Sequence, residues 1–241
     1  MTDVSIPYTD LKAIFFDVGG TLVGMNYQLM AETLTHAGLQ TTPEQAMRAE
    51  VAARPVLSDA LAQANDGVAE DFFAIMMGAV IENIPGGQTS DKAKLTSLLT
   101  ALIPPYGRHQ DFWTTPLPGA ITGLRLLKEM GIPLVAVSNS DGSAEPVLEK
   151  ADMREFFEGI IDSHHVGVSK PDPAIFNYAF KIRNTAPHET LYIGDIYAGD
   201  VIAARRAGLH AALVDPYDDY QNIDCPTFPT IEALAIAMSG G

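Results

Sequence analysis

Short, continuous apolar runs recur along the chain, and most of them end in a polar residue. Runs of this kind are typical of strands that are buried on both faces of a parallel sheet. They lie at residues 12–17, 133–138, 159–162, 190–195 and 211–215. Because segments with a helical pattern separate these runs, the alternation predicts an α/β fold with a doubly wound, Rossmann-like parallel sheet.

Three of the intervening segments have clear helix signals. Residues 117–130 carry apolar side chains at helical spacing and are closed by Gly131, and residues 198–207 stop at Gly208. Between them, Asp172 begins a helix as a capping residue followed by a proline. In a doubly wound sheet of this kind, functional sites collect at the carboxyl ends of the strands.

The segment from residue 25 to residue 113 has a different pattern. It contains no convincing strand, and its Ala, Met and Leu residues recur at helical spacing. Thr42 and Gln45 form the capping box of one helix start. We therefore predict an all-helical insertion, the cap, at residues 25–113, and an α/β core at residues 1–24 and 114–241.

The cap also contains a group of bulky apolar side chains. These are Phe72, Phe73, Met76, Met77 and Trp113. Because Met and aromatic residues at helical spacing most often pack in a core, we predict that they fill the interior of the cap and do not line a ligand pocket.

Composition and charge narrow the class of protein. Of the 241 residues, 47% are hydrophobic and 19% are charged, which excludes a disordered chain. Thirty acidic residues against 15 basic ones give a formal charge of −15, which disfavours nucleic acid and anionic lipid as partners. The sequence shows no apolar run of about 18 residues, no leader pattern and a single cysteine, Cys225. We expect a cytoplasmic protein that does not enter a membrane.

Polar side chains at the predicted strand ends are candidates for chemistry. Asp17 follows the first strand and precedes a glycine-rich turn, whose backbone N–H groups are free to hold an anion. Ser138 ends the second strand, and Lys170 precedes a capped helix. Asp195 and Asp200 stand at a strand end and in the first turn of the next helix. A carboxylate nucleophile, a hydroxyl, a lysine and an acidic pair at one sheet edge indicate phosphoryl transfer, with Mg²⁺ held by the acids.

These residues stand in four motifs whose order and spacing resemble those of the haloacid dehalogenase superfamily. The resemblance is to the branch with a helical cap inserted after the first core strand, and it covers residues 11–24 and 116–215. The motifs are Asp17-Val18-Gly19-Gly20-Thr21, Val137-Ser138-Asn139, Lys170-Pro171-Asp172-Pro173, and Gly194-Asp195 through Gly199-Asp200.

The resemblance implies a role for each position. Asp17 is implied as the nucleophile that forms a covalent aspartyl intermediate. Ser138 is implied as the residue that hydrogen-bonds the transferred group, and Lys170 as the cation that orients the nucleophile and offsets its charge. The implied substrate-binding positions are Val18, Gly19 and Asn139.

The same resemblance implies a Mg²⁺ cofactor and a small phosphorylated metabolite as the ligand. The implied metal ligands are Asp17, the backbone carbonyl of Gly19, Asp195 and Asp200. No nucleic acid or membrane partner is implied, and the oligomeric state is left open.

One position departs from the family pattern. Phosphatases of this family carry a second Asp two residues after the nucleophile, which serves as general acid and base, and here that residue is Gly19. General acid–base catalysis typically contributes about 10²–10⁴-fold, so its loss is expected to slow ester cleavage. In the family, only the backbone carbonyl of this position binds the metal, and the resemblance implies that Gly19 supplies it.

Three functions remain consistent with these residues. The first is a Mg²⁺-dependent phosphatase of reduced activity that acts on a small phosphomonoester. The second is a catalytically weak member that binds a phosphorylated ligand in a regulatory role. The third is a 2-haloacid dehalogenase. The resemblance disfavours it, because dehalogenases of the family have an altered acidic motif and an aromatic residue two positions after the nucleophile. Here the Asp195/Asp200 pair is intact and position 19 is not aromatic.

Two further groups have simpler interpretations. Asp162 and Asp215 also end strands, and we interpret them as ordinary strand-to-loop residues. His164 and His165 are adjacent on a segment interpreted as extended, where neighbouring side chains point in opposite directions, so we expect them at a surface or rim and not as a metal site.

Overall fold

The core of the protein is a six-stranded sheet in which every pair of neighbouring strands is parallel. The computed structural model describes residues 6–64 and 72–240. The strand order is β5-β4-β1-β6-β7-β8. The strands are β1 (Ala13–Phe16), β4 (Leu134–Ser138), β5 (Gly159–Asp162), β6 (Thr190–Gly194), β7 (His210–Val214) and β8 (Thr227–Phe228). The prediction of a doubly wound parallel sheet is confirmed.

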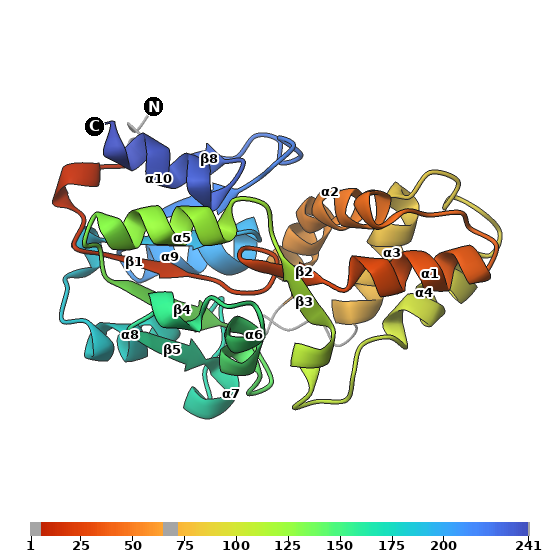
Figure 1. Cartoon of the computed structure of the whole chain (residues 1–241), viewed down its shortest axis with the longest axis horizontal. Coiled ribbons are helices and arrows are strands. Elements are labelled where there is room, and N and C mark those ends of the chain that lie inside the picture. Colours follow the sequence, from red (N-terminus) through yellow and green to blue (C-terminus); the bar gives the residue numbers. More distant parts are fainter. Residues whose placement is uncertain (1–5, 65–71, 241) are drawn as a thin grey trace.

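Helices cover both faces of this sheet (Figure 1). Ile14 and Phe16 of β1 point to one face and Ala13 and Phe15 to the other, as the two-residue period of a strand requires. The first face is covered by α5 (Ala120–Glu129), α6 (Ala144–Lys150) and α10 (Ile231–Ser239). The second face is covered by α8 (Phe176–Ile182) and α9 (Ile202–Arg206).

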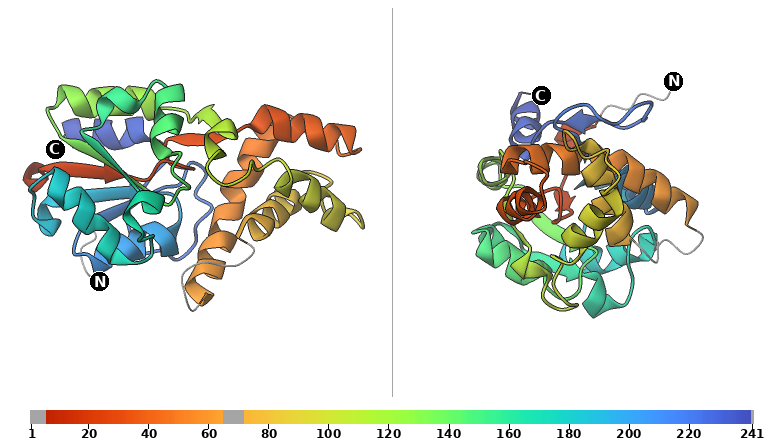
Figure 2. Two further views of the ribbon diagram at one scale, coloured as in Figure 1. Left: turned by 90° about the horizontal axis from the view of Figure 1, so that it is seen from below. Right: turned by 90° about the vertical axis from the view of Figure 1, so that its right-hand side faces the viewer.

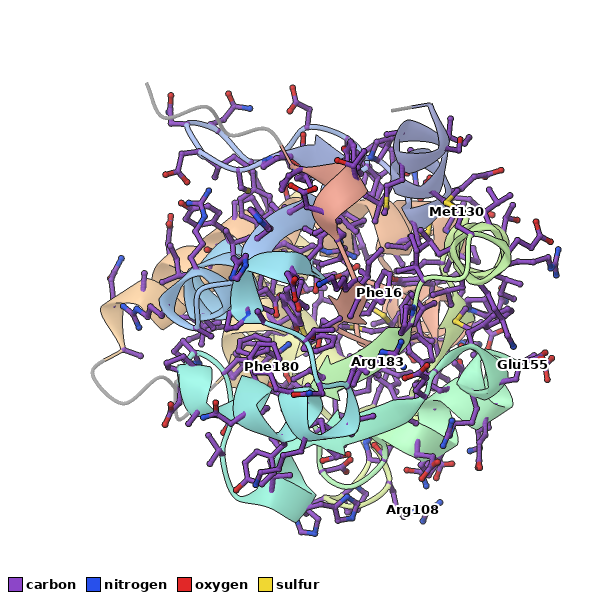
Figure 3. All side chains as sticks on the ribbon, turned by 90° about the vertical axis from the view of Figure 1, so that its left-hand side faces the viewer. Phe16, Arg108, Met130, Glu155, Phe180 and Arg183 are labelled. Carbon is purple, nitrogen blue, oxygen red and sulfur yellow. The ribbon has the colours of Figure 1, made fainter. Side chains whose placement is uncertain are left out.

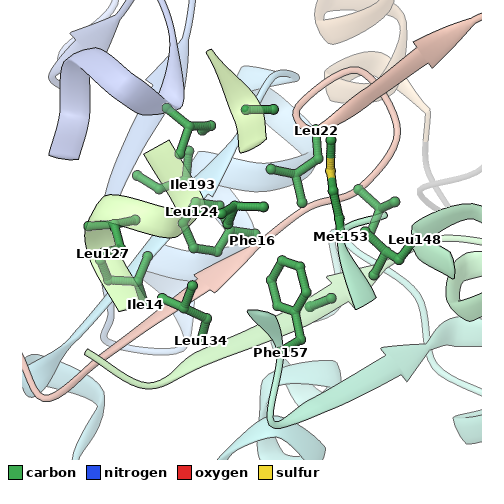
Figure 4. Packing of buried hydrophobic residues seen from close by; sticks show 14 of the residues in the cluster. Ile14, Phe16, Leu22, Leu124, Leu127, Leu134, Leu148, Met153, Phe157 and Ile193 are labelled. Carbon is green, nitrogen blue, oxygen red and sulfur yellow. The ribbon is translucent and has the colours of Figure 1, made fainter. Parts of the chain in front are cut away.

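The packing of the first face is shown in Figure 4, where Phe16 lies between Leu124 of α5 and the side chain of Phe157. Seen from the end of the core that lies away from the cap, Phe16 is at the centre of the molecule and the charged Arg108 and Glu155 are at its outline (Figure 3). Complete burial of the β1 side chains fixes the strand in the middle of the sheet and with it the loop that follows Phe16.

In the described residues, the cap has four helices, which lie beyond the carboxyl edge of the sheet (Figures 1 and 2). They are α1 (Tyr27–His36), α2 (Pro43–Gln63), α3 (Phe72–Asn83) and α4 (Lys92–Thr100). The predicted capping box of Thr42 and Gln45 is present at the start of α2. The cap has its own hydrophobic core, in which Met76 and Met77 are buried.

A short antiparallel pair of strands links the cap to the core. The chain leaves through β2 (Val23–Met25) and returns through β3 (Trp113–Pro116), in a register that places Met25 opposite Trp113. The sequence pattern did not reveal the strands β2, β3 and β8, because segments of two to four residues show no usable period. It also did not reveal the C-terminal helix α10, which lies outside the motifs. None of the helices in the described part of the chain is both long and apolar enough to cross a bilayer.

Candidate active site

The candidate site is built around Asp17, which follows the central strand β1. The neighbours of β1 are β4 and β6, and Phe16 is in register with Ala136 and Ile193. The residues that follow these strands therefore meet at one point of the sheet edge, where the strand order reverses. The side chain of Asp17 is 10% exposed.

Lys170 joins two carboxylates at this point. Its Nζ atom lies 2.7 Å from Asp17 Oδ1, 2.7 Å from Asp200 Oδ1 and 2.7 Å from the hydroxyl of Tyr192. A lysine ammonium has three N–H donors, so all of them are used. Burial alone would lower the pKa of Lys170, but the two carboxylates raise it above its ordinary value, so the side chain stays charged.

Asn139 fixes the backbone of Lys170 from the neighbouring strand end. Its Oδ1 accepts from the backbone N–H of Lys170 at 2.8 Å, and its Nδ2 donates to the Lys170 carbonyl at 2.8 Å. This paired contact holds the loop of Lys170 against the end of β4. The backbone of Asn139 was predicted to help bind substrate, and the residue lines the cavity while its side chain holds Lys170 in place.

Asp200 is hydrogen-bonded at both oxygens. Its Oδ1 accepts from Lys170 and from the Tyr192 hydroxyl at 3.1 Å, and its Oδ2 accepts from the backbone N–H groups of Asp195 and Ile196 at 3.1 and 2.9 Å. It stands in a π-helical turn, Tyr197–Val201, just before α9. Asp200 thereby ties the loop after β6 to Lys170.

Asp195 approaches the turn after β1. Its Oδ1 accepts from the Thr21 hydroxyl at 3.2 Å, and its Oδ2 lies 3.4 Å from Arg54 Nε of the cap. Carboxylate oxygens of Asp17, Asp195 and Asp200 all lie within 4.8 Å of one another. Burial is the largest cause that raises the pKa of Asp195 well above its ordinary value, opposed by Arg54 and reinforced by Asp200 and Asp17.

The nucleophile candidate shares this electrostatic environment. Burial raises the pKa of Asp17 to about 6, although Lys170 acts in the opposite direction. The neighbouring carboxylate of Asp200 raises it further. Two of the three buried acids, Asp17 and Asp195, therefore have raised pKa values. A bound cation would favour the charged forms of these carboxylates, so the cluster is arranged to accept one.

The cap contributes a buried arginine that the sequence analysis did not identify. Arg54 of α2 is 1% exposed, and its Nε and Nη2 atoms each lie 3.0 Å from an oxygen of Glu50. Glu50 also accepts from the Tyr27 hydroxyl at 3.1 Å, whereas Arg54 Nη1 is buried with no partner among the described residues. The sequence held a signal for this pair, because an Arg and a Glu four residues apart fall on the apolar face of the predicted helix.

A cavity of about 490 Å³ lies between the cap and the sheet edge. On the core side it is lined by Asp17, Ser138, Lys170, Asp195 and Asp200, and on the cap side mostly by apolar residues. The apolar lining residues from the cap side are Met25, Leu57, Leu61, Phe72, Phe73, Met76 and Trp113.

This lining corrects one prediction. Phe72, Phe73, Met76 and Trp113 were predicted to be core and not pocket, but they line the cavity as well as packing in the cap. The reason is that the inner face of the cap covers the sheet edge, so one side of its core is also the wall of the site. Of the five residues, only Met77 has the predicted purely internal position.

The remaining predicted positions lie as follows. Ser138 is buried and lines the cavity, as do Val18 and Gly19. A Cβ atom on Gly19 would meet Trp113 Nε1 at 3.2 Å, so an indole of β3 stands beside the position where the family's second acid is expected. Two residues of the site were not identified from the sequence. Tyr192 lies within the apolar run of β6, and Thr21 lies in the glycine-rich turn.

The structure also bears on the simpler interpretations. Asp162 accepts hydrogen bonds from the backbone N–H groups of His164, just after its strand, and of Gly142 and Ala144, which follow β4. Asp215 accepts from the backbone N–H groups of Asp219 and Tyr220 in the loop after β7, so both acids are strand-to-loop residues, as predicted. His164 and His165 are exposed, as expected, but they lie in a short helix, α7 (Ser163–Val166), and not on an extended segment. Asp162 caps that helix, which explains why the histidine segment turns.

The close approach of Asp195 to Gly20 gives a testable prediction. Gly20 has a φ of +78°, and a Cβ atom there would lie 2.2 Å from Asp195 Oδ2. We expect Gly20→Ala to lower the free energy of unfolding by about 3 kcal/mol, which combines the left-handed backbone cost with the displaced carboxylate. Gly38→Ala is the matched control, because its φ is +96° and nothing lies within 4 Å of the added atom. Urea denaturation should show a loss of only about 1 kcal/mol there, and equal losses would contradict the contact.

Comparison with known proteins agrees with this geometry. The family model described as hydrolase, haloacid dehalogenase-like hydrolase, matches residues 11–208. Haloacid dehalogenase-like hydrolase domain-containing protein 3 of Xenopus laevis is 31% identical over 112 residues, which are 45% of this chain and 46% of that protein. The match thus spans less than half of that relative's length.

Two further proteins are similar over most of the chain. A phosphoglycolate phosphatase of Thiobacillus denitrificans is 27% identical over 200 residues, which are 82% of this chain and 80% of that protein. The magnesium-bound structure of YfnB from Bacillus subtilis is similar in fold, with a TM-score of 0.62 at 20% identity, and the similarity covers 95% of this chain and 98% of that one.

Proposed function

The chain belongs to the haloacid dehalogenase-like hydrolases, and on this premise we propose that it is a Mg²⁺-dependent phosphatase acting on a small phosphomonoester. The observation that carries the proposal is the arrangement of Asp17. One of its oxygens is held by Lys170 while its side chain borders the cavity beside Asp195. The similarity to a protein named phosphoglycolate phosphatase supports the reaction class.

In the proposed reaction, Asp17 attacks phosphorus through the carboxylate oxygen that Lys170 does not hold. The bond from phosphorus to the ester oxygen breaks, and its electron pair leaves with the alcohol. Lys170 offsets the negative charge of the phosphoryl group, and Ser138 donates a hydrogen bond to one of its oxygens. Water then attacks the phosphoaspartate, which releases phosphate and restores the Asp17 carboxylate.

The charges of the buried cluster fit a divalent cation. Among the described residues, Lys170 and Arg54 are the ion-pair partners of the four buried acids, which leaves a formal charge of −2; the acids are Asp17, Asp195, Asp200 and Glu50. We propose that Mg²⁺ balances this charge, held by Asp17, Asp195 and the Gly19 carbonyl, and that it supplies positive charge to the phosphoryl oxygens. Asp200, whose oxygens accept hydrogen bonds from Lys170, Tyr192 and two backbone N–H groups, would bind the ion or its water.

The cavity favours one kind of alcohol. Among the described residues that line it, Lys170 is the single Lys or Arg, and its three donors are already used. The cap side offers Met, Leu and aromatic surfaces instead. We therefore propose a phosphomonoester of a neutral, largely apolar alcohol, since no Lys or Arg of the described lining is free to pair with a second anionic group.

A panel of phosphomonoesters, assayed with and without Mg²⁺, tests this function. We expect Mg²⁺-dependent phosphate release, with kcat/KM at least about tenfold higher for benzyl phosphate than for 2-phosphoglycolate. Absence of release from any ester, together with measurable binding of phosphate, would favour the regulatory alternative. Release of halide from a 2-haloacid without metal would instead establish a dehalogenase.

The proposed metal also affects stability in a pH-dependent way. The pKa of Asp17 is raised from 3.8 to about 6 and that of Asp195 is raised as well, so both acids favour the native state when protonated. For Asp17 this contribution is complete below about pH 4 and is lost as the pH rises through about 6. Since Mg²⁺ binds the charged forms, we expect it to raise Tm more at pH 7.5 than at pH 5. Differential scanning calorimetry measures this, and a larger rise at pH 5 would contradict the assignment.

A further inference from the structure

A histidine faces the same cavity from the segment that returns from the cap. His109 begins the short turn η2 (His109–Asp111), which lies just before β3. Its ring packs edge-on against Phe73 at 5.5 Å between centroids and tilted against Trp113 at 5.5 Å. The side chain is 18% exposed and lines the cavity together with Asp17.

A buried carboxylate orients this imidazole. His109 Nδ1 lies 3.4 Å from Oδ2 of Asp141, which is 3% exposed and stands in the loop after β4. Asp141 also accepts from the backbone N–H groups of Gly107 and His109 and from the Ser143 hydroxyl. Burial alone would raise the pKa of Asp141, but these hydrogen bonds and the neighbouring His109 lower it, so the carboxylate is charged. With Nδ1 directed at Asp141, Nε2 is the ring nitrogen left to exchange a proton.

The indole of Trp113 stands beside position 19 of the first motif and also packs against this histidine. A Cβ atom on Gly19 would meet Trp113 Nε1 at 3.2 Å, and the Trp113 ring is the one that packs against His109. The imidazole and position 19 are therefore both neighbours of the same indole. No carboxylate extends from position 19 itself, because that residue is glycine.

We propose that His109, oriented by Asp141, is the general acid and base that replaces the absent second acid; the inference rests on the proposed phosphatase function. As Asp17 forms its bond to phosphorus, the bond to the ester oxygen breaks and protonated His109 gives its Nε2 proton to that oxygen, which leaves as the neutral alcohol. Neutral His109 then takes a proton from the water that attacks the phosphoaspartate. The Asp17 carboxylate leaves with the electron pair of its bond to phosphorus, and His109 is protonated again.

The groups around His109 are compatible with this role. On its own segment stand Tyr106, Arg108 and Asp111, and Arg108 pairs with Asp111 at 2.8 Å. Lys150 of α6 also pairs with Asp111, at 2.9 Å, and His164 of α7 pairs with the Tyr106 hydroxyl at 2.9 Å. In the described part of the chain, Asp141 is the one charged group in contact with the imidazole itself.

The test compares a poor leaving group with an activated one in the full-length protein with Mg²⁺. His109→Asn keeps a donor toward Asp141 but cannot transfer a proton. We expect it to lower kcat/KM for benzyl phosphate by about 10²–10⁴-fold and for 4-nitrophenyl phosphate by less than about tenfold, since a stable phenolate needs little protonation. His164→Gln, which removes an exposed imidazole from the same rim, should change neither.

Two further measurements separate proton transfer from a structural effect. The pH profile of kcat/KM for benzyl phosphate should contain one limb in the wild type that is absent in His109→Asn. Adding Gly19→Asp to His109→Asn should restore benzyl phosphate turnover at least about tenfold, because the usual acid is then present. The backbone at position 19 allows the change, and Trp113 must move by a few tenths of an ångström.

The outcomes distinguish the inference from the function on which it rests. If the wild type releases phosphate from neither ester, the phosphatase function itself is wrong. If the wild type cleaves both esters and His109→Asn matches it on benzyl phosphate, only the role of His109 is wrong. Equal loss on both esters, with no rescue by Gly19→Asp, would show that His109 acts through packing and would also overturn the proposal.

Discussion

Replacing Asp17 by asparagine should abolish Mg²⁺-dependent phosphate release from activated and unactivated esters alike, a loss of ~10⁴-fold or more in kcat. Asparagine has nearly the same shape, but its amide cannot form the aspartyl phosphate on which the proposed reaction depends. The loss should therefore not depend on the leaving group, unlike that expected for His109→Asn. Phosphate release in steady state, with malachite green detection, measures both.

The variant should fold, which makes the loss of activity interpretable. Burial raises the pKa of Asp17 from 3.8 to about 6, so the charged carboxylate disfavours the metal-free native state at pH 7 by up to about 3 kcal/mol. A neutral amide removes this cost while Lys170 keeps Asp200 and Tyr192 as partners. We therefore expect the Tm of metal-free Asp17→Asn to equal or exceed that of the wild type.

Asp172→Asn is a matched control for the chemical change. Asp172 is exposed and caps the turn at Pro173–Ile175, where asparagine is an equally good cap. Its phosphate release should equal that of the wild type. If Asp17→Asn retained more than one hundredth of the wild-type rate in the same preparation, Asp17 would not be the nucleophile and the proposed function would fail.

The central site was predictable because its residues are fixed by local sequence. Asp17, Ser138 and Asp195 each follow a buried apolar run, so the strand itself determines where the next side chain lies. Parallel strands then bring these positions to one edge without further information. Lys170 and Asp200 follow from the same logic, because each stands next to a signal for a helix start.

The cap contribution was not predictable in this way. Whether Arg54 meets Asp195 depends on how α2 docks on the loop after β6, and no local pattern encodes that orientation. The same holds for Trp113, whose place beside Gly19 depends on the register of β2 against β3, and for His109, which packs against that indole. Hydrophobic periodicity placed the apolar side chains in the interior of the cap, but it could not show that one side of that interior also lines a cavity.

The buried arginine gives the prediction with the largest expected effect on stability. Arg54→Met should lower the free energy of unfolding of the metal-free protein at pH 7.5 by about 3–5 kcal/mol. Methionine fills much of the same volume, so the loss comes from charge. Glu50 and Asp195 would both remain buried without the guanidinium that now lies 3.0 and 3.4 Å from their oxygens.

Arg48→Met on the same helix is the control. Arg48 forms a bidentate pair with Asp219 at 2.7 and 2.8 Å and also connects the cap with the core, but its side chain is 42% exposed. Exposed pairs contribute about 0.2–1 kcal/mol, so the control should lose no more than that. Urea denaturation of both variants measures the difference, and equal losses would show that burial of the Arg54 pair has no special energetic role.

A double variant identifies the uncompensated charges as the cause. Adding Glu50→Gln to Arg54→Met removes one buried carboxylate, and it should recover at least about 1 kcal/mol of the loss.

The pH dependence of the loss provides a second criterion. Arg54 lowers the pKa of Asp195, so without Arg54 burial and the neighbouring acids raise that pKa further. Protonation then relieves the cost, so Arg54→Met should be closer to the wild type at pH 5 than at pH 7.5. A loss that is equal at the two pH values and unchanged by Glu50→Gln would trace the effect to packing of the arginine stem and not to its charge.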